Sequence, residues 1–292
     1  MKARRIVLVF ALCTLALVAC RPIKKAPGPT LPPPDTYVAL GDSFVAGPLI
    51  PVQDTGPTAG CLRSSNNYPH LVAPSTGLPK FVDVSCSGAQ TRHMMEEQGV
   101  DPGPNPPQFN ALSLTTGLVT IGIGGNDIGF SNVATTCGQA FLTGGSCQNS
   151  FTPPLSERIA ATAPKVDVVL DAIRSLAPQA RILVTNYLPI FPEGPDPITG
   201  IEGCPPQMPI NPADVPFLRG VQKQLNQMLA DQAAANGAVL VDAYTAGIGH
   251  DACKDPVTRW VEPAVFVPLA APVHPNLAGM QAVANEVAAA IA

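Results

Sequence analysis

Short apolar runs alternate along this chain with longer segments in which apolar residues recur every three or four positions. The runs, which are each closed by a turn residue or a polar segment, predict five strands at residues 37–40, 81–86, 118–123, 181–187 and 238–241. The helical spacing predicts three helices at residues 155–177, 214–236 and 276–291. Alternating strands and helices indicate an α/β domain, with a parallel sheet covered by helices on both faces.

Short segments containing Gly or polar residues follow the first three predicted strands, at residues 41–44, 87–89 and 124–127. In open parallel sheets ligands bind beyond the carboxyl ends of the strands, so we expect the chemistry of this protein in these segments. Stretches rich in Pro, Gly and Cys are predicted to form long loops over the same edge, at residues 101–107, 137–154 and 192–212.

The N-terminus has the pattern of a targeting segment. Basic residues within the first five positions precede an apolar run at residues 6–19, which is too short to span a bilayer comfortably and is typical of a signal peptide. The run ends in Leu-Val-Ala-Cys, which resembles the bacterial lipobox, where the cysteine is lipidated before cleavage. We therefore predict a signal peptide at residues 1–19 and a lipid on Cys20. The alternative is an ordinary secretory signal followed by an incidental cysteine.

A proline-rich stretch follows the predicted signal peptide. Residues 20–34 are expected to be an extended tether, because they hold the prolines Pro22, Pro27, Pro29, Pro32, Pro33 and Pro34. Residues 35–292 are enough for one α/β domain with its own core. The protein is therefore expected to be exported and held by its lipid at the outer face of the cell membrane or cell envelope.

Charge and cysteine content narrow the possible functions. The net charge is -4 and the basic residues form no cluster, so we expect no nucleic-acid partner. The cysteines after Cys20 are even in number, which in an exported protein predicts disulfides, with fifteen possible pairings among Cys61, Cys86, Cys137, Cys147, Cys204 and Cys253. None of these cysteines has Cys-x-x-Cys spacing and the histidines are scattered, so we expect no metal site.

Gly41-Asp42-Ser43 follows the first predicted strand. Gly41 allows a tight turn, and the Asp42 side chain can brace it. Such a turn exposes the Ser43 hydroxyl at the carboxyl end of the strand, where a substrate binds. This predicts a nucleophile at Ser43, although the same three residues also suit a plain turn into a helix N-cap.

A serine nucleophile needs a base and donors for the oxyanion. His274 lies after the fifth predicted strand and just before the last helix, at the sheet edge of Ser43, and is the candidate base. Gly88 after the second strand offers a backbone N–H, and Asn126 after the third offers a side-chain amide. Each of them could singly be an ordinary loop or turn residue.

Together these four blocks resemble the SGNH (GDSL) hydrolase family, named for Ser, Gly, Asn and His, which stand here at Ser43, Gly88, Asn126 and His274. The resemblance covers residues 35–292. Within the family, the chain most resembles secreted actinobacterial esterases and lipases, so we expect the host to be a bacterium of that kind. It implies a flavodoxin-like three-layer α/β/α sandwich with a five-stranded parallel sheet in the order 2-1-3-4-5. It also implies the disulfides Cys61–Cys86, Cys137–Cys147 and Cys204–Cys253.

One position departs from the family pattern. The last block usually reads Asp-x-x-His, but Ala271 stands where the carboxylate that orients the histidine is expected. Some actinobacterial members use a main-chain carbonyl instead, so we predict that the Ala271 carbonyl accepts from His274 Nδ1. Asp251 and Asp255 lie upstream and are the alternative orienting groups.

The resemblance implies a serine esterase or lipase that acts by two-step acyl transfer. Ser43 attacks an ester carbonyl, His274 is the general base, and the N–H groups of Ser43 and Gly88 and the Asn126 side chain hold the oxyanion. We expect a monomer that needs no cofactor and takes an ester or lipid substrate. Alternatives are a phospholipase A, a polysaccharide deacetylase or an acyltransferase on the same site, or a cell-surface binding lipoprotein that has lost catalysis.

Overall fold

The computed structural model describes residues 31–265 and 270–292. The predicted signal peptide and most of the predicted tether therefore lie outside the described residues. Residues 32–292 form one compact unit. None of the helices in the described ranges is long and apolar enough to cross a membrane.

The centre of the unit is a five-stranded parallel sheet in the order β2-β1-β3-β4-β5, which confirms the predicted fold class. The strands are β1 (Thr36–Gly41), β2 (Lys80–Asp83), β3 (Thr116–Gly122), β4 (Arg181–Thr185) and β5 (Val239–Val241). Residues of the central strands, such as Leu40, Ile121 and Leu183, are fully buried. Near-continuous apolar strands are what a parallel sheet covered on both faces requires.

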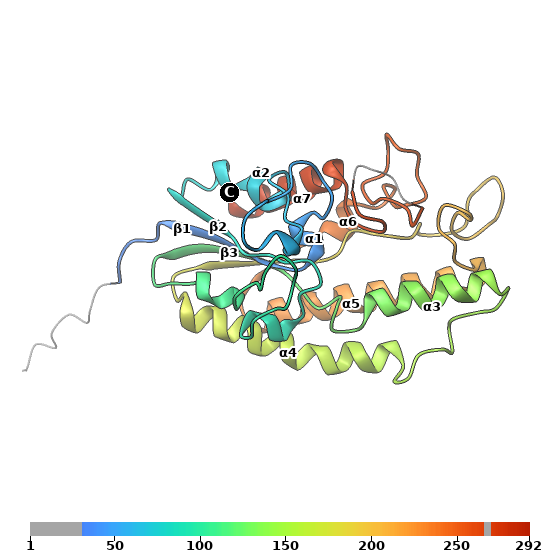
Figure 1. Ribbon diagram of the computed structural model, residues 1–292, viewed down its shortest axis with the longest axis horizontal. Coiled ribbons are helices and arrows are strands. Elements are labelled where there is room, and N and C mark those ends of the chain that lie inside the picture. Colours follow the sequence, from blue (N-terminus) through green and yellow to red (C-terminus); the bar gives the residue numbers. More distant parts are fainter. Residues whose placement is uncertain (1–30, 266–269) are drawn as a thin grey trace, which may run out of the picture. The chain divides into compact units, whose positions relative to one another are not determined.

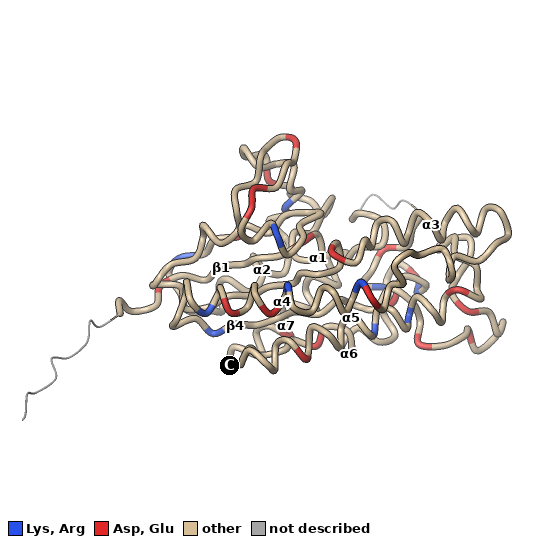
Figure 2. Tube along the Cα trace, turned by 90° about the horizontal axis from the view of Figure 1, so that it is seen from below, with Lys and Arg blue, Asp and Glu red and all other residues tan. Residues whose placement is uncertain are grey.

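Helices cover both faces of the sheet (Figure 1). They are α1 (Ser43–Ala46), α2 (Tyr68–Val72), α3 (Phe130–Leu142), α4 (Leu155–Leu176), α5 (Val215–Ala235), α6 (Ala243–Ala246) and α7 (Leu277–Ile291). Helices α4 and α5 pack against each other on one face, and α2 and α7 pack together on the other (Figure 1). Lys, Arg, Asp and Glu are interspersed along the trace of the described chain (Figure 2).

Two predicted boundaries differ from the structure by more than two residues. Residues 137–142 are not loop, because α3 continues through them and buries Val133 and Cys137 on its inner side. The second strand stops at Asp83 instead of residue 86, because the Asp83 carboxylate accepts hydrogen bonds from the N–H and hydroxyl of Ser85. A side chain that bonds the next backbone N–H groups turns the chain out of the sheet.

The three disulfides are Cys61–Cys86, Cys137–Cys147 and Cys204–Cys253, the pairing that the family resemblance implies. The first joins the loop after α1 to the segment that follows β2. The second joins the middle of α3 to the loop that follows the helix, and the third links the loop after β4 to the loop after β5. Each of them therefore holds a loop at the carboxyl edge of the sheet.

Candidate active site

Ser43 is the first residue of α1 and follows directly after β1. Gly41 at the end of the strand has a φ of +148°, and a Cβ at this position would lie 2.6 Å from the Gly122 carbonyl oxygen. Only glycine fits so close to the neighbouring strand. The turn brings Ser43 Oγ to 2.8 Å from His274 Nε2, so the structure pairs the predicted nucleophile with the predicted base.

The other three histidines have different partners. His93 Nδ1 accepts from the Gln90 N–H, His70 Nδ1 lies 2.7 Å from Asn67 Oδ1, and His250 Nδ1 lies 2.6 Å from the Thr258 carbonyl. The sequence position of His274 before α7 therefore picks out the histidine that reaches Ser43.

The carbonyl that orients His274 is that of Pro272, not that of Ala271 as predicted. His274 Nδ1 lies 2.8 Å from the Pro272 oxygen, whereas the Ala271 oxygen accepts from the His274 backbone N–H at 3.2 Å. Val273 between them has a φ of +62°, a left-handed conformation that is rare for a β-branched residue. This local turn presents the Pro272 carbonyl to the ring, and periodicity cannot show such a turn.

Neither of the two alternative carboxylates orients the ring. The Asp251 carboxylate accepts from the Cys253 N–H, and the Asp255 carboxylate accepts from the N–H groups of Val257 and Thr258. Within residues 31–265 and 270–292, no carboxylate is hydrogen-bonded to His274 Nδ1. The arrangement is thus a Ser–His pair in which a neutral acceptor holds the tautomer that leaves Nε2 free to accept from Ser43.

Burial lowers the pKa of His274, and the Pro272 carbonyl raises it by a smaller amount. A carbonyl accepts the Nδ1 proton but supplies no negative charge to stabilise the imidazolium. The neutral ring, which is the form that can take a proton from Ser43, therefore persists to lower pH than for an exposed histidine.

Asp42 braces the turn through its side chain, as predicted, and also contacts Tyr187, a residue that the sequence analysis did not single out. Its buried carboxylate accepts from the Phe44 N–H at 2.9 Å and from the Tyr187 hydroxyl at 2.6 Å. Burial raises the pKa of Asp42 to about 7, and these two hydrogen bonds oppose that rise. The Tyr187 hydroxyl also accepts from the Gly125 N–H at 2.7 Å, so Tyr187 joins the turn of the nucleophile to the turn that carries Asn126. The signal for Tyr187 was its place at the end of the fourth predicted strand, residues 181–187, at the same sheet edge.

The predicted oxyanion donors lie at this edge. Gly88 has a φ of +79°, and its N–H has no hydrogen-bond acceptor among the residues that the structure describes. The N–H of Ser43 is at the first position of α1, where a helix provides no acceptor. Asn126 Nδ2 donates to the Ala89 carbonyl at 2.9 Å, which fixes its amide beside the Gly88 segment.

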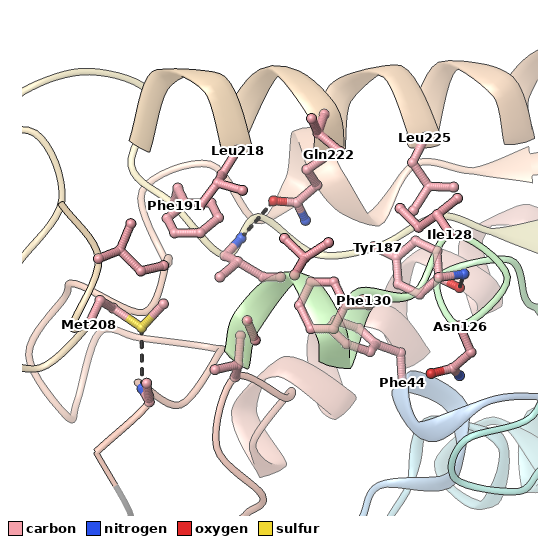
Figure 3. A pocket seen from close by; sticks show the side chains of 18 of the residues that line it. Phe44, Asn126, Ile128, Phe130, Tyr187, Phe191, Met208, Leu218, Gln222 and Leu225 are labelled. Carbon is pink, nitrogen blue, oxygen red and sulfur yellow. Dashed lines mark hydrogen bonds between the residues drawn. The ribbon is translucent and has the colours of Figure 1, made fainter. Parts of the chain in front are cut away.

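An apolar pocket begins at Ser43 and Asn126 and runs between α3, α5 and the segment after β4 (Figure 3). Ser43 and Asn126 line one part of it, and its apolar walls include Phe130, Val133, Phe191, Met208, Leu218 and Leu225. Gln222 is a polar residue in the wall, but its amide accepts from the Ile190 N–H and donates to the Leu188 carbonyl. The pocket therefore suits a hydrocarbon chain.

The described part of the chain contains no group of three His, Cys, Asp or Glu side chains placed as metal ligands.

Comparisons with family models, curated proteins and solved structures agree on one family. A model of the GDSL-like Lipase/Acylhydrolase family matches residues 39–282. Lipase 2 of Streptomyces coelicolor is 40% identical over 285 residues, which cover 95% of this chain and 92% of that protein. The crystal structure of phospholipase A1 from Streptomyces albidoflavus has a TM-score of 0.70 and 26% identity, covering 89% of this chain and 100% of that one. An extracellular lipase from Streptomyces rimosus has a TM-score of 0.64 and 27% identity, covering 85% of this chain and 95% of that one.

Proposed function

The chain belongs to the GDSL-like lipase/acylhydrolase family and is a carboxylic ester hydrolase, and we propose that it cleaves esters of long acyl chains with Ser43 as nucleophile and His274 as base. The observation that carries this proposal is the 2.8 Å hydrogen bond between Ser43 Oγ and His274 Nε2 beside an apolar pocket. A nucleophile bonded to a base, with the base oriented by a third group, is the arrangement that activates a hydroxyl.

In the proposed acylation step, Ser43 Oγ bonds to the ester carbonyl carbon while its proton passes to His274 Nε2. The carbonyl oxygen becomes an oxyanion, which the N–H groups of Ser43 and Gly88 and the Asn126 amide stabilise. His274 then gives the proton to the leaving alcohol oxygen, and the carbon–oxygen bond breaks to leave an acyl ester on Ser43.

Deacylation repeats this sequence with water. The water gives a proton to His274 and bonds to the acyl carbon, and a second oxyanion forms at the same donors. When it collapses, the bond to Ser43 Oγ breaks, the proton returns from His274 to that oxygen, and the carboxylic acid leaves. Each step uses only water and groups of this chain.

The substrate's acyl group is assigned from the pocket walls. The lining side chains beyond Ser43 and Asn126 are mostly aliphatic or aromatic, and the backbone satisfies the amide of Gln222. Burial of a methylene group in such a pocket contributes about 0.8 kcal/mol. A short acetyl group would leave most of this surface uncovered, so the pocket favours a long acyl chain over an acetylated polysaccharide.

Gly138 offers a direct test of the acyl pocket. It lies on α3, lines the pocket, and a Cβ built on it meets no heavy atom within 4 Å. We expect Gly138→Leu to obstruct the pocket and lower kcat/KM for a dodecanoyl ester at least about tenfold relative to a butanoyl ester, since pocket contacts discriminate substrates on this scale. Rates for p-nitrophenyl esters of increasing chain length measure this.

Gly220 provides the matched control. It lies on α5, also has open space at its Cβ, and does not line the pocket. Gly220→Leu should leave the chain-length profile unchanged. A Gly138→Leu variant with the wild-type profile would show that the acyl chain binds elsewhere.

A phospholipid is the second candidate substrate. The specific support is the similarity to the phospholipase A1 structure, which extends over that whole chain. The acyl pocket is compatible with a phospholipid ester as well as with a neutral one, and the same chain-length test applies to both.

We also propose that the protein is exported and anchored by a lipid on Cys20. The basic start, the apolar run and the Leu-Val-Ala-Cys sequence support this, and a similar protein is described as an extracellular lipase. In a bacterial host, the Cys20→Ser variant should carry no lipid. It should be found as unprocessed precursor or as protein released from the membrane fraction. Detergent partitioning and mass spectrometry of the N-terminal peptide measure this. An unmodified Cys20 on the mature wild-type protein would contradict the lipid anchor and would leave only the proposal of export.

A further inference from the structure

The peptide group between Ser87 and Gly88 carries one of the proposed oxyanion donors. Its N–H belongs to Gly88 and has no acceptor within the described residues. Its carbonyl oxygen belongs to Ser87 and accepts from the Gln98 Nε2 at 2.8 Å. A trans peptide group is planar, with its C=O and N–H pointing in opposite directions. A hydrogen bond that fixes the carbonyl on one side therefore fixes the direction of the N–H on the other.

Gln98 is well placed to hold this peptide. Its residue is 6% exposed, and its backbone N–H and C=O both pair with Asn105 at 2.9 Å. A Cβ on Gly88 would lie 3.6 Å from Gln98 Nε2, so the amide lies close to Gly88. The Oε1 atom is buried and has no partner among the described residues, so the bond to Ser87 is the polar contact that the structure assigns to this side chain.

The other backbone donor is held in a different way. The peptide between Asp42 and Ser43 has its carbonyl bonded by the N–H groups of Val45 and Ala46, at 3.1 and 2.9 Å. These are backbone contacts within α1, and they use no side-chain atom. The Ser87–Gly88 peptide lies in a loop without such contacts on its carbonyl, so a side chain supplies the support that the helix gives to Ser43.

We propose that Gln98 is a positioning residue for the oxyanion hole: its side-chain amide holds and polarises the Ser87–Gly88 peptide so that the Gly88 N–H faces the developing oxyanion. The inference rests on the proposed function, because it assigns a role within that site. Gln98 touches no reacting atom and acts through Gly88. A donor bonded at its own carbonyl is also a stronger donor, because linked hydrogen bonds polarise one another.

Gln98→Met tests this, because methionine keeps the length of the side chain and removes the amide. We expect kcat to fall about ten- to a hundredfold with KM changed less than threefold, somewhat below the loss seen when an oxyanion donor is removed outright.

An alkylboronic acid gives a second readout of the Gln98→Met variant. The Ser43 oxygen bonds to boron, the Ser43 proton passes to His274, and a tetrahedral anion forms with no group leaving. Its inhibition constant should rise by the same factor as kcat falls, whereas that of an alkanol of equal chain length should not change.

Gln98→Glu keeps the shape of the side chain and gives a pH signature. The carboxylate cannot donate to the Ser87 carbonyl, whereas the protonated carboxyl can. The ratio of the variant's kcat/KM to that of the wild type should therefore rise as the pH is lowered towards the pKa of the introduced carboxyl group. Gln179→Met is the matched control, because Gln179 Nε2 also donates to backbone carbonyls, those of Pro32 and Leu114, but at the amino-terminal end of the sheet.

Three results would overturn the inference: a folded Gln98→Met variant with kcat within twofold of the wild type, equal weakening of boronic acid and alkanol, or a pH-independent ratio for Gln98→Glu. Failure of the proposed function would look different. The wild type would then hydrolyse no ester, or the Ser43→Ala variant would keep the wild-type activity.

Discussion

Replacing Ser43 with alanine should lower kcat for ester hydrolysis by about 10⁴- to 10⁶-fold, since knocking out the nucleophile of a serine hydrolase has effects on this scale. The hydroxyl is the group that His274 Nε2 bonds at 2.8 Å, and alanine leaves no atom to form the acyl ester. Labelling by a fluorophosphonate should disappear in the variant, and in the wild type the label should map to the peptide that contains Ser43. Residual hydrolysis would reflect binding and the oxyanion donors alone.

Ser131→Ala is a suitable control, because Ser131 is an exposed serine on α3. It should keep wild-type activity and labelling. Circular dichroism and thermal melting would show that both variants are folded. A folded Ser43→Ala protein that keeps most of its activity, or a label on another serine, would remove the nucleophile from the proposed mechanism.

Replacing His274 with alanine should lower kcat by at least about 10⁴-fold with little change in KM, because the loss of the base is nearly as costly as the loss of the nucleophile. The wild type should also show an informative pH profile. As the pH falls through the pKa of His274, the ring takes up a proton and cannot accept one from Ser43, so activity is lost. Since burial lowers this pKa, the acidic limb of kcat/KM should lie below the usual histidine value of about 6.5.

Asp42 is the other group near Ser43 that can titrate in this range, because burial raises its pKa to about 7. Asp42→Asn removes this titration, so a limb that remains in the variant belongs to His274.

Asp255→Asn should leave kcat within a few-fold, because Asp255 caps a turn of its own loop. A fall of about 10⁴-fold in that variant, as when a triad carboxylate is neutralised, would contradict the Ser–His pair.

The five strands and the four candidate site residues could be predicted from the order of residues along the chain. A parallel sheet buried on both faces needs apolar strands, and these are visible as short runs in one dimension. The positions of Ser43, Gly88, Asn126 and His274 just after strands or before the last helix placed them at one sheet edge, because the carboxyl ends of parallel strands meet there. The helix through residues 137–142 was missed since its glycine and cysteine also suit a loop, and only packing of α3 over the pocket distinguishes the two.

The hydrogen bonds that hold the candidate site residues could not be predicted before the fold was known. The choice of Pro272 over Ala271 depends on the left-handed turn at Val273, which no pattern of residue types encodes. The contacts of Tyr187 with Asp42 and of Gln98 with Ser87 join residues that are not neighbours in the chain. Hydrophobic periodicity reports which side of an element is buried, and a motif reports which groups are present. The direction of a single N–H or carbonyl depends on hydrogen bonds from other segments, and these exist only once the chain has folded.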